Sequence, residues 1–78
     1  MKQYVDVICM YQRNVQIKPL SVLWNNGCEY RIDRITQVVP ATSSYSGHKG
    51  LRFTCMFGSN ERYLFLDEGK WFIEQVVL

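Results

Sequence analysis

The pattern of apolar and polar residues is clearest in the last third of the chain. Apolar runs at residues 51–57, 63–66 and 71–73 are separated by the turn formers Gly58-Ser59-Asn60 and Asp67-Glu68-Gly69-Lys70. Aromatic and β-branched runs that are bounded by Gly, Asn and Asp are typical of consecutive antiparallel strands. This part of the sequence therefore predicts a three-stranded β-meander.

Three more strands are expected in the first half of the chain, over residues 3–11, 15–24 and 28–39, where apolar and polar residues alternate. Pro19 has no N–H for a strand ladder, so its segment is expected at a sheet edge or at the start of pairing. Asn25-Asn26-Gly27 is a strong signal for a tight hairpin turn of type I′.

The third of these strands contains a change of spacing. Apolar residues alternate up to Ile32, and the next one, Ile35, follows three residues later. An inserted residue produces such a change, so we expect a bulge or bend near Asp33-Arg34. Residues 40–50 follow without periodicity and predict a long surface loop.

The lengths of the turns predict which residues face each other in the meander. A three-residue loop at 58–60 pairs Phe53 with Phe65, and a two-residue turn at Glu68-Gly69 pairs Leu66 with Trp71. Because side chains alternate, one face then carries Phe53, Cys55, Phe57, Tyr63, Phe65, Phe72 and Val76. The opposite face carries Met56, Leu64, Leu66, Trp71 and Ile73, together with Arg52, Thr54 and Arg62. Both faces are apolar, unlike those of a single-layer sheet with one face in water.

We therefore expect an all-β fold: a small six-stranded, mostly antiparallel meander that forms a curved or rolled barrel, with residues 1–78 as one domain. Of these residues 47% are hydrophobic and 14% aromatic, which is rich for so small an interior. A twofold homodimer is the commonest way to cover surplus apolar surface. The interface residues expected on the second face are Leu64, Leu66, Trp71 and Ile73. In the alternative, the loop and the termini cover this face.

The charge pattern leaves the partner open. The formal net charge is +2, a weak bias for a nucleic-acid-binding protein. Basic residues nevertheless gather around the 40–50 loop, and a small barrel can bind single strands through such a basic groove. The residues of this alternative site are Arg31, Arg34, His48, Lys49 and Arg52, with Tyr45 as a stacking ring. Against this site, Glu29 and Asp33 share the predicted strand with Arg31 and Arg34, and mixed charge is typical of a solvated face.

No constellation of catalytic residues is found. His48 stands beside serines without an orienting carboxylate, and no Gly-rich stretch opens a helix that could bind phosphate. We expect no enzyme activity, no cofactor and no catalytic residues. Cys9, Cys28 and Cys55 share no CxxC spacing, so we expect no metal site and interpret them as buried, reduced thiols of a cytoplasmic protein. Neither a signal peptide nor a membrane span is expected.

Three stretches carry a resemblance. They are Pro19-Leu20 with Trp24, Gly27, Tyr30, Ile32-Asp33 and Ile35; Arg52-Phe53-Thr54-Cys55; and Arg62-Tyr63-Leu64-Phe65-Leu66 with Lys70-Trp71-Phe72. The chain resembles a family of small, uncharacterised all-β cytoplasmic proteins of low-GC Gram-positive bacteria, which implies a compact β domain and supplies no catalytic residues. The hairpin from Trp24 to Ile32 also looks like that of short β proteins sometimes encoded beside lesion-bypass DNA polymerases.

The function expected from the sequence is a non-enzymatic small β-barrel interaction module that self-associates through an apolar sheet face. The alternative is a nucleic-acid-binding accessory domain, with a link to DNA repair, that uses the basic patch near the 40–50 loop. A small-molecule barrel is less well supported, because side chains fill the interior of so small a barrel.

Overall fold

Strands account for all the regular structure in the computed structural model of the chain, which describes residues 2–13, 16–42 and 49–74. No helix occurs within these ranges, so the all-β prediction is confirmed, with seven strands in place of six. The strands are β1 (Lys2–Tyr11), β2 (Ile17–Leu23), β3 (Glu29–Arg31), β4 (Arg34–Thr42), β5 (Lys49–Phe57), β6 (Asn60–Asp67) and β7 (Lys70–Glu74).

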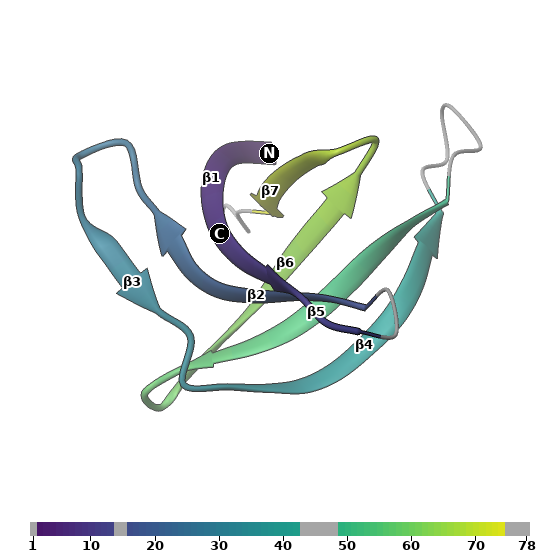
Figure 1. Cartoon of the computed structure of the whole chain (residues 1–78). Helices are drawn as coiled ribbons and strands as arrows, with labels where there is room; N and C mark the ends of the chain where they lie inside the picture. Colours follow the sequence, from purple (N-terminus) through teal and green to yellow (C-terminus); the bar gives the residue numbers. More distant parts are fainter. Residues whose placement is uncertain (1, 14–15, 43–48, 75–78) are drawn as a thin grey trace.

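The strands form one antiparallel sheet in the order β3-β2-β1-β7-β6-β5-β4. The sheet curls into a half-barrel, as the prediction of a curved or rolled barrel expected (Figure 1). The first and last strands pair at its centre, where Lys2 lies opposite Glu74 and Val5 opposite Trp71. The two edge strands are β3 and β4, which follow each other in the chain. They do not pair with each other, so the half-barrel is open between them.

The bend predicted near Asp33-Arg34 is confirmed, and it is the reason for the seventh strand. Ile32 donates its N–H to the Leu20 carbonyl on one side of the sheet, and Asp33 donates its N–H to the Met56 carbonyl on the other. The chain therefore changes from the β2 edge to the β5 edge within two residues. A register shift also interrupts the pairing of β4 with β5 between Ile35 and Gln37, slightly beyond the Asp33-Arg34 position where the sequence predicts an inserted residue.

Two of the three predicted turns differ from expectation. Glu68 and Gly69 have positive φ angles of 52° and 76°, so the predicted two-residue turn is confirmed. The β5–β6 connection is a two-residue Gly58-Ser59 turn in place of the predicted three-residue loop, because Phe57 pairs with Asn60. Gly58 at φ 63° supplies the first central position of a type II′ turn.

The loop after β2 also departs from the prediction of a type I′ turn. Gly27 donates its N–H to the Trp24 carbonyl at 3.0 Å, and Trp24 donates its N–H to the Cys28 carbonyl at 2.8 Å. Gly27 has a positive φ of 85°, while Asn26 does not. This is a three-residue loop that closes with glycine in the left-handed region, the next most common hairpin connection.

The shorter β5–β6 turn reverses part of the predicted face assignment. Phe53 pairs with Leu64, and Cys55 with Arg62, so β6 is displaced by one residue from the predicted register. A displacement of one residue exchanges the two faces of a strand. The inner face therefore carries Leu51, Phe53, Cys55, Leu64, Leu66, Trp71 and Ile73. The outer face carries Arg52, Thr54, Met56, Tyr63, Phe65 and Phe72. Val76 lies outside the described residues.

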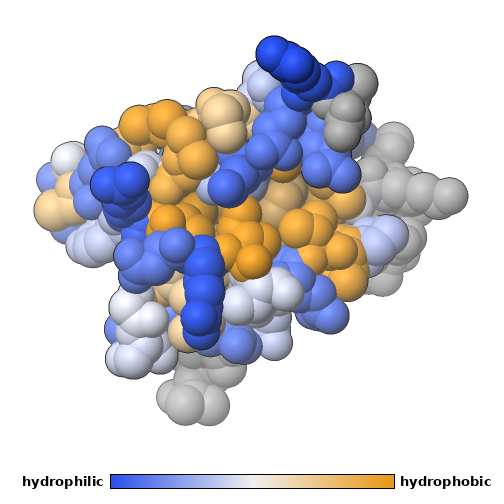
Figure 2. Space-filling model, turned by 60° about the horizontal axis from the view of Figure 1, so that its bottom comes forward, coloured by the Kyte–Doolittle hydropathy of each residue, from blue (hydrophilic) through white to orange (hydrophobic). Residues whose placement is uncertain are grey.

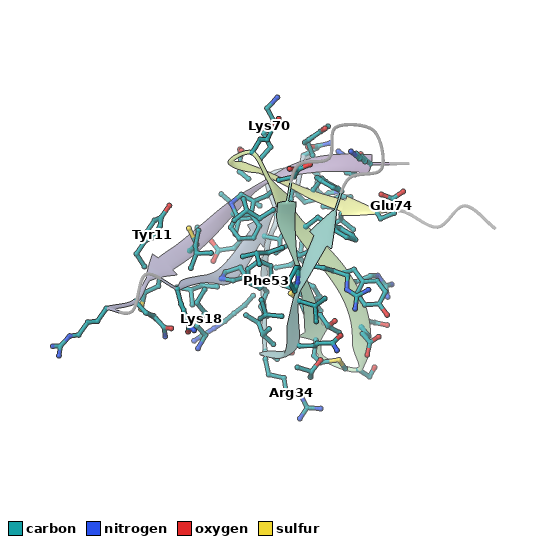
Figure 3. The ribbon with its side chains drawn as sticks, turned by 90° about the vertical axis from the view of Figure 1, so that its right-hand side faces the viewer. Tyr11, Lys18, Arg34, Phe53, Lys70 and Glu74 are labelled. Atoms are coloured by element: carbon teal, nitrogen blue, oxygen red, sulfur yellow. The ribbon has the colours of Figure 1, made fainter. Side chains whose placement is uncertain are left out.

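The buried core lies on the inner face. It joins Val5 of β1 and Val22 of β2 to Phe53, Cys55 and Leu64 of β5 and β6. Figure 3 shows Phe53 near the middle of the molecule. The two ends of the sheet therefore share one core, although few of the residues that contribute to it are fully buried.

Residues 40–42 and 49–50 of the segment predicted as a loop belong to strands, and residues 43–48 lie outside the described residues. Strand β4 continues through Pro40 to Thr42, and β5 begins at Lys49. Pro40 is accommodated because β4 is an edge strand, where a missing N–H on the outer side costs no ladder bond. Pro19, likewise, follows a register shift and lies outside the part of β2 that pairs with β3, as expected for a proline in a strand.

Candidate interaction surface at the open seam

The two edge strands carry large apolar residues that point inward and are nevertheless exposed. Val38 on β4 lies opposite Phe53, and Tyr30 on β3 lies opposite Val22, so each belongs to the inner face. Phe53 and Val22 are each 1% exposed, whereas Val38 is 51% and Tyr30 47% exposed. The difference arises because each edge strand has a neighbour on one side only. We call this gap between β3 and β4 the open seam.

Further apolar residues that pack against the core are only partly covered. Among those packed against the core without being buried are Ile17, Ile32, Ile35 and Phe57. The space-filling view from the lower side of Figure 1 shows apolar residues gathered in the middle of this side, with polar residues around them (Figure 2). The open side of the half-barrel is thus an apolar surface bordered by polar groups, as recognition surfaces often are.

The predicted interface residues belong to the same inner face, at different depths. Leu64 is 1% exposed and lies in the core, so its side chain is covered within the single chain. Leu66, Trp71 and Ile73 are half-buried and pack against the core. The ring centroid of Trp71 lies 5.5 Å from that of Phe53. These residues support the inner face from below and do not form a second exposed face as predicted.

The residues predicted to bind nucleic acid do not form one cluster. Arg31 and Arg34 flank the bend, while Lys49 begins β5 at the opposite end of the long β4–β5 ladder. Arg34 pairs with Met56, seven residues from Lys49, which corresponds to roughly 23 Å along a strand. Arg52 lies between these ends on the outer face. His48 and Tyr45 lie outside the described residues.

The carboxylate of Asp33 makes a contact that sequence analysis did not predict. It accepts a hydrogen bond from the N–H of Gly58, in the β5–β6 turn. The bend between the two edge strands is therefore fastened to the adjacent β5–β6 turn. The signal for this contact is not local, because the two residues lie 25 positions apart in the sequence.

The outer face carries a group of aromatic rings that sequence analysis did not single out. Phe72 stacks on Phe65 with 5.0 Å between ring centroids, and Tyr4 meets Phe72 edge-on at 5.7 Å. Two cations lie over this group, the Lys2 ammonium over Phe72 and the Arg52 guanidinium over Tyr63, each at 4.7 Å from the ring centroid. The correctly predicted β6–β7 turn already places Tyr63, Phe65 and Phe72 on one face, and the observed β5–β6 register adds Arg52 to it.

The three cysteines differ in environment. Cys55 is fully buried, and burial raises the pKa of its thiol to about 11. Cys9 is half-buried and Cys28 is exposed, so the prediction of three buried thiols is wrong for Cys28, which follows a turn at the end of the sheet. Over the described ranges, no group of three or more His, Cys, Asp or Glu residues is arranged to hold a metal ion.

Comparisons with known proteins found no matching family, no matching curated protein and no matching solved structure. The part of the chain that the structure describes also contains no helix of the length and apolarity needed to cross a membrane.

Proposed function

We propose that the protein is a non-enzymatic interaction module that associates with a second copy of itself through the open seam. The observation that carries the proposal is the exposure of Val38 and Tyr30, which face inward and are 51% and 47% exposed. Inward-facing apolar side chains at two adjacent edges favour a partner that continues the sheet across the gap. Leu66, Trp71 and Ile73 of the same inner face are half-buried against the core, so the proposed interface moves from these residues to the edge strands.

The area of the molecule supports this proposal. The solvent-accessible surface is 5940 Å² for a chain of 9.2 kDa. A compact monomer of this mass exposes about 4,900 Å², so the surplus is on the order of 1,000 Å². A stable interface buries about 800 Å² on each partner. The surplus is therefore sufficient to form a dimer interface of ordinary size.

The positions of charged and apolar residues along strand β4 are compatible with such an interface. Val38 is the middle residue of Arg34–Thr42, so an antiparallel pair of β4 strands centred on it keeps the two Arg34 side chains at opposite ends. Like charges therefore do not meet across the twofold axis. Pro40 lacks an N–H on this outer side, so each Pro40 leaves one hydrogen bond of such a pair unformed.

The test is the oligomeric state of a charge variant at the seam. In Val38→Glu, dimerisation would bury a carboxylate in the interface, so this variant is expected to be a folded monomer. The wild type is expected to have about twice the mass of one chain. The matched control is Gln37→Glu, which adds the same charge one residue away on the opposite face and keeps an acceptor for Arg52, now 3.0 Å from Gln37. Size-exclusion chromatography with light scattering gives the masses, and far-UV circular dichroism checks folding. A monomeric wild type at all concentrations, or a dimeric Val38→Glu, contradicts the proposal.

A second candidate, binding of single-stranded nucleic acid, has one observation in its favour. The Arg52 guanidinium lies 4.7 Å from the Tyr63 ring centroid, and Tyr63 is 43% exposed, so a cation and a stacking face occur together on the outer face. Fluorescence anisotropy with a labelled single strand at two salt concentrations tests it, because phosphate contacts weaken steeply with salt. Binding that is lost in Arg52→Ala and kept in Val38→Glu would favour this candidate.

We also propose a cytoplasmic location. It is supported by three free cysteines in different environments, because paired disulfides are usual for small domains in oxidising compartments. Measuring the free thiols of the protein purified from its own cells tests this location. A disulfide between two of the three cysteines would contradict it.

A further inference from the structure

The loop between β2 and β3 contains a sequence that is chemically labile as well as a turn signal. Asn26 is followed by Gly27, and both residues are exposed. Figure 1 shows this loop at the upper left, projecting from the sheet. The backbone nitrogen of the residue after an asparagine can attack the asparagine side chain, and glycine hinders this attack least because it carries no side chain. The loop therefore has the sequence of a spontaneous modification site.

The side chain of Asn26 is held in a position that favours this attack. Its Oδ1 accepts a hydrogen bond from the Cys28 N–H at 2.9 Å. This bond closes an Asx turn around Gly27, so the carboxamide is folded back along the Gly27 peptide. Attack on the carboxamide carbon moves negative charge onto Oδ1, and a backbone N–H that already donates to this oxygen stabilises that charge.

The backbone of Gly27 both permits and slows the reaction. A Cβ at this position would meet no heavy atom within 4 Å, so the loop has space for the ring that the attack forms. The Gly27 N–H, however, donates to the Trp24 carbonyl at 3.0 Å, and this bond must open before the nitrogen can attack. An exposed loop opens locally at much lower cost than the whole fold. The folded protein therefore slows the reaction without preventing it.

The other asparagines in the described ranges are less well suited. Asn25 is followed by Asn26, whose own side chain stands beside the attacking nitrogen. Asn60 is followed by Glu61 and begins β6, where the ladder holds its backbone. Paired strand backbone resists the rotation that brings a side-chain carbon onto the next nitrogen. Asn14 lies outside the described residues. Asn26 is thus expected to react first.

We propose that Asn26 is a site of spontaneous deamidation, in which Gly27 supplies the attacking nitrogen. This nitrogen gives its proton to water and forms a bond to Asn26 Cγ. The C–N bond of the carboxamide then breaks, and ammonia leaves. Water opens the resulting succinimide ring to aspartate or to isoaspartate. In sum, a water molecule is consumed and an ammonia molecule is released, so the step needs no oxidant and no cofactor.

The two products act differently on β3. Aspartate leaves the backbone unchanged, and its carboxylate can still accept the bond from the Cys28 N–H. Isoaspartate leads the main chain through the former side chain and lengthens the loop. Strand β3 pairs with β2 only from Glu29 to Arg31, and the loop sets the register of this short pairing. The isoaspartate form is therefore expected to loosen the β3 edge. Deamidation itself does not depend on self-association.

The experiment incubates the full chain at neutral to mildly alkaline pH. Mass spectrometry of its peptides at successive times locates the mass gain that exchange of NH₂ for OH produces. The rate at Asn26 is expected to exceed the rates at Asn25 and Asn60 by at least about tenfold. The free peptide of residues 23–30 gives the rate of the unstructured loop. The folded chain is expected to be slower than this peptide by less than roughly a hundredfold, because only a local hydrogen bond has to open.

Two glycine variants separate the chemistry from a general loosening of the fold. Gly27→Ala places a side chain on the attacking residue and is expected to slow deamidation of Asn26 by at least about tenfold, although the positive φ destabilises the loop. Gly58→Ala is the matched control, because it strains another turn with positive φ and open space around it. It should leave the rate at Asn26 unchanged. Circular dichroism checks that both variants fold.

The effect on β3 is measured separately, by hydrogen exchange at residues 29–31. Exchange is expected to be faster in the isoaspartate form than in Asn26→Asp, which carries the same charge on an unchanged backbone. Equal exchange in the two forms would overturn the effect on β3. Any of the three rate ratios outside its stated range, or a changed rate in Gly58→Ala, would overturn the deamidation proposal. Val38→Glu must deamidate at the wild-type rate, which keeps this result distinct from failure of the self-association proposal.

Discussion

The ladder formed by β4 to β7 and the hairpin arm formed by β1 to β3 use the same alternating pattern with different results. In the ladder, Phe53, Cys55 and Leu64 are at most 1% exposed. In the distal arm, Ile8 and Met10 are 44% and 42% exposed. The difference is in the number of neighbours, because β5 and β6 each have a strand on both sides, whereas distal β1 has one on a single side.

This comparison shows that alternation fixes the local conformation of a strand but does not fix its burial. A side chain is buried when strands on both sides, and the curl of the sheet, bring other side chains over it. Most of the buried apolar residues therefore belong to the ladder, while the arm and the edges leave large apolar side chains exposed. Substitutions in the two regions should differ accordingly.

The largest difference is expected between two aromatic truncations. Phe53→Ala leaves a cavity in the core and is expected to reduce the free energy of unfolding by about 3–5 kcal/mol. Tyr11→Ala, in the arm, removes a ring that is 77% exposed and is expected to change it by less than about 0.5 kcal/mol. Urea denaturation at a fixed protein concentration measures both. Similar losses in the two variants would show that the arm is as tightly packed as the ladder.

A smaller difference is expected between two glycine substitutions. A Cβ at Gly50, in the ladder, would clash with the backbone carbonyl oxygen of Leu66, so Gly50→Ala is expected to cost about 3 kcal/mol. Gly27, in the β2–β3 loop, has open space around it and only its φ of 85° to oppose a side chain, so Gly27→Ala is expected to cost about 1 kcal/mol. Thermal unfolding of both variants checks the order. The reverse order would mean that β5 and β6 can separate at low cost.

The contact that joins the two regions gives the next prediction. Asp33→Ala removes the acceptor for the Gly58 N–H and is expected to cost about 1 kcal/mol. Asp33→Asn is the matched control, because its side-chain carbonyl can still accept this bond and should recover most of the loss. Native-state hydrogen exchange at Gly58 is expected to become faster in the alanine variant. Unchanged exchange would show that the bend and the turn are independent.

The smallest effect concerns the pH dependence contributed by Cys55. Burial raises the pKa of this thiol from 9.0 to about 11, so the unfolded chain loses the proton at lower pH than the folded chain does. Its contribution to stability is therefore constant below about pH 8 and decreases as pH rises from about 9 toward 11, by less than about 1 kcal/mol at pH 9.5. The difference between wild type and Cys55→Ala isolates this contribution from that of other titrating groups. A difference that does not change from pH 7 to 10 would contradict the burial of the thiol.

The burial of Cys55 can also be checked by the rate at which its thiol reacts. Cys28 is exposed at the β2–β3 loop, so it is expected to react with a thiol reagent much faster than Cys55 at neutral pH. Mass spectrometry after timed labelling gives the order of modification. Labelling of Cys55 before Cys28 would show that the ladder opens more readily than the arm.

The sequence by itself determined the strand class, the bend near Asp33 and the Glu68-Gly69 turn. These features depend on the chemistry of a few adjacent residues, namely β-branched alternation and glycine at positive φ. At residues 58–60 the pattern of adjacent residues led to the prediction of a three-residue loop, although Gly58-Ser59 also fits the two-residue turn that the structure has. One residue of error exchanged the faces of β6, and with them the expected interface.

The tertiary structure alone decided which face is inner and which edges are open. The pairing of Lys2 with Glu74 joins residues near opposite ends of the described chain, and nothing in either segment specifies the other. The length of β4 likewise separates Arg34 from Lys49, which adjacency in the sequence had placed in one patch. Pairing and curl depend on all strands together, so which apolar side chains stay exposed is decided only when the sheet is assembled.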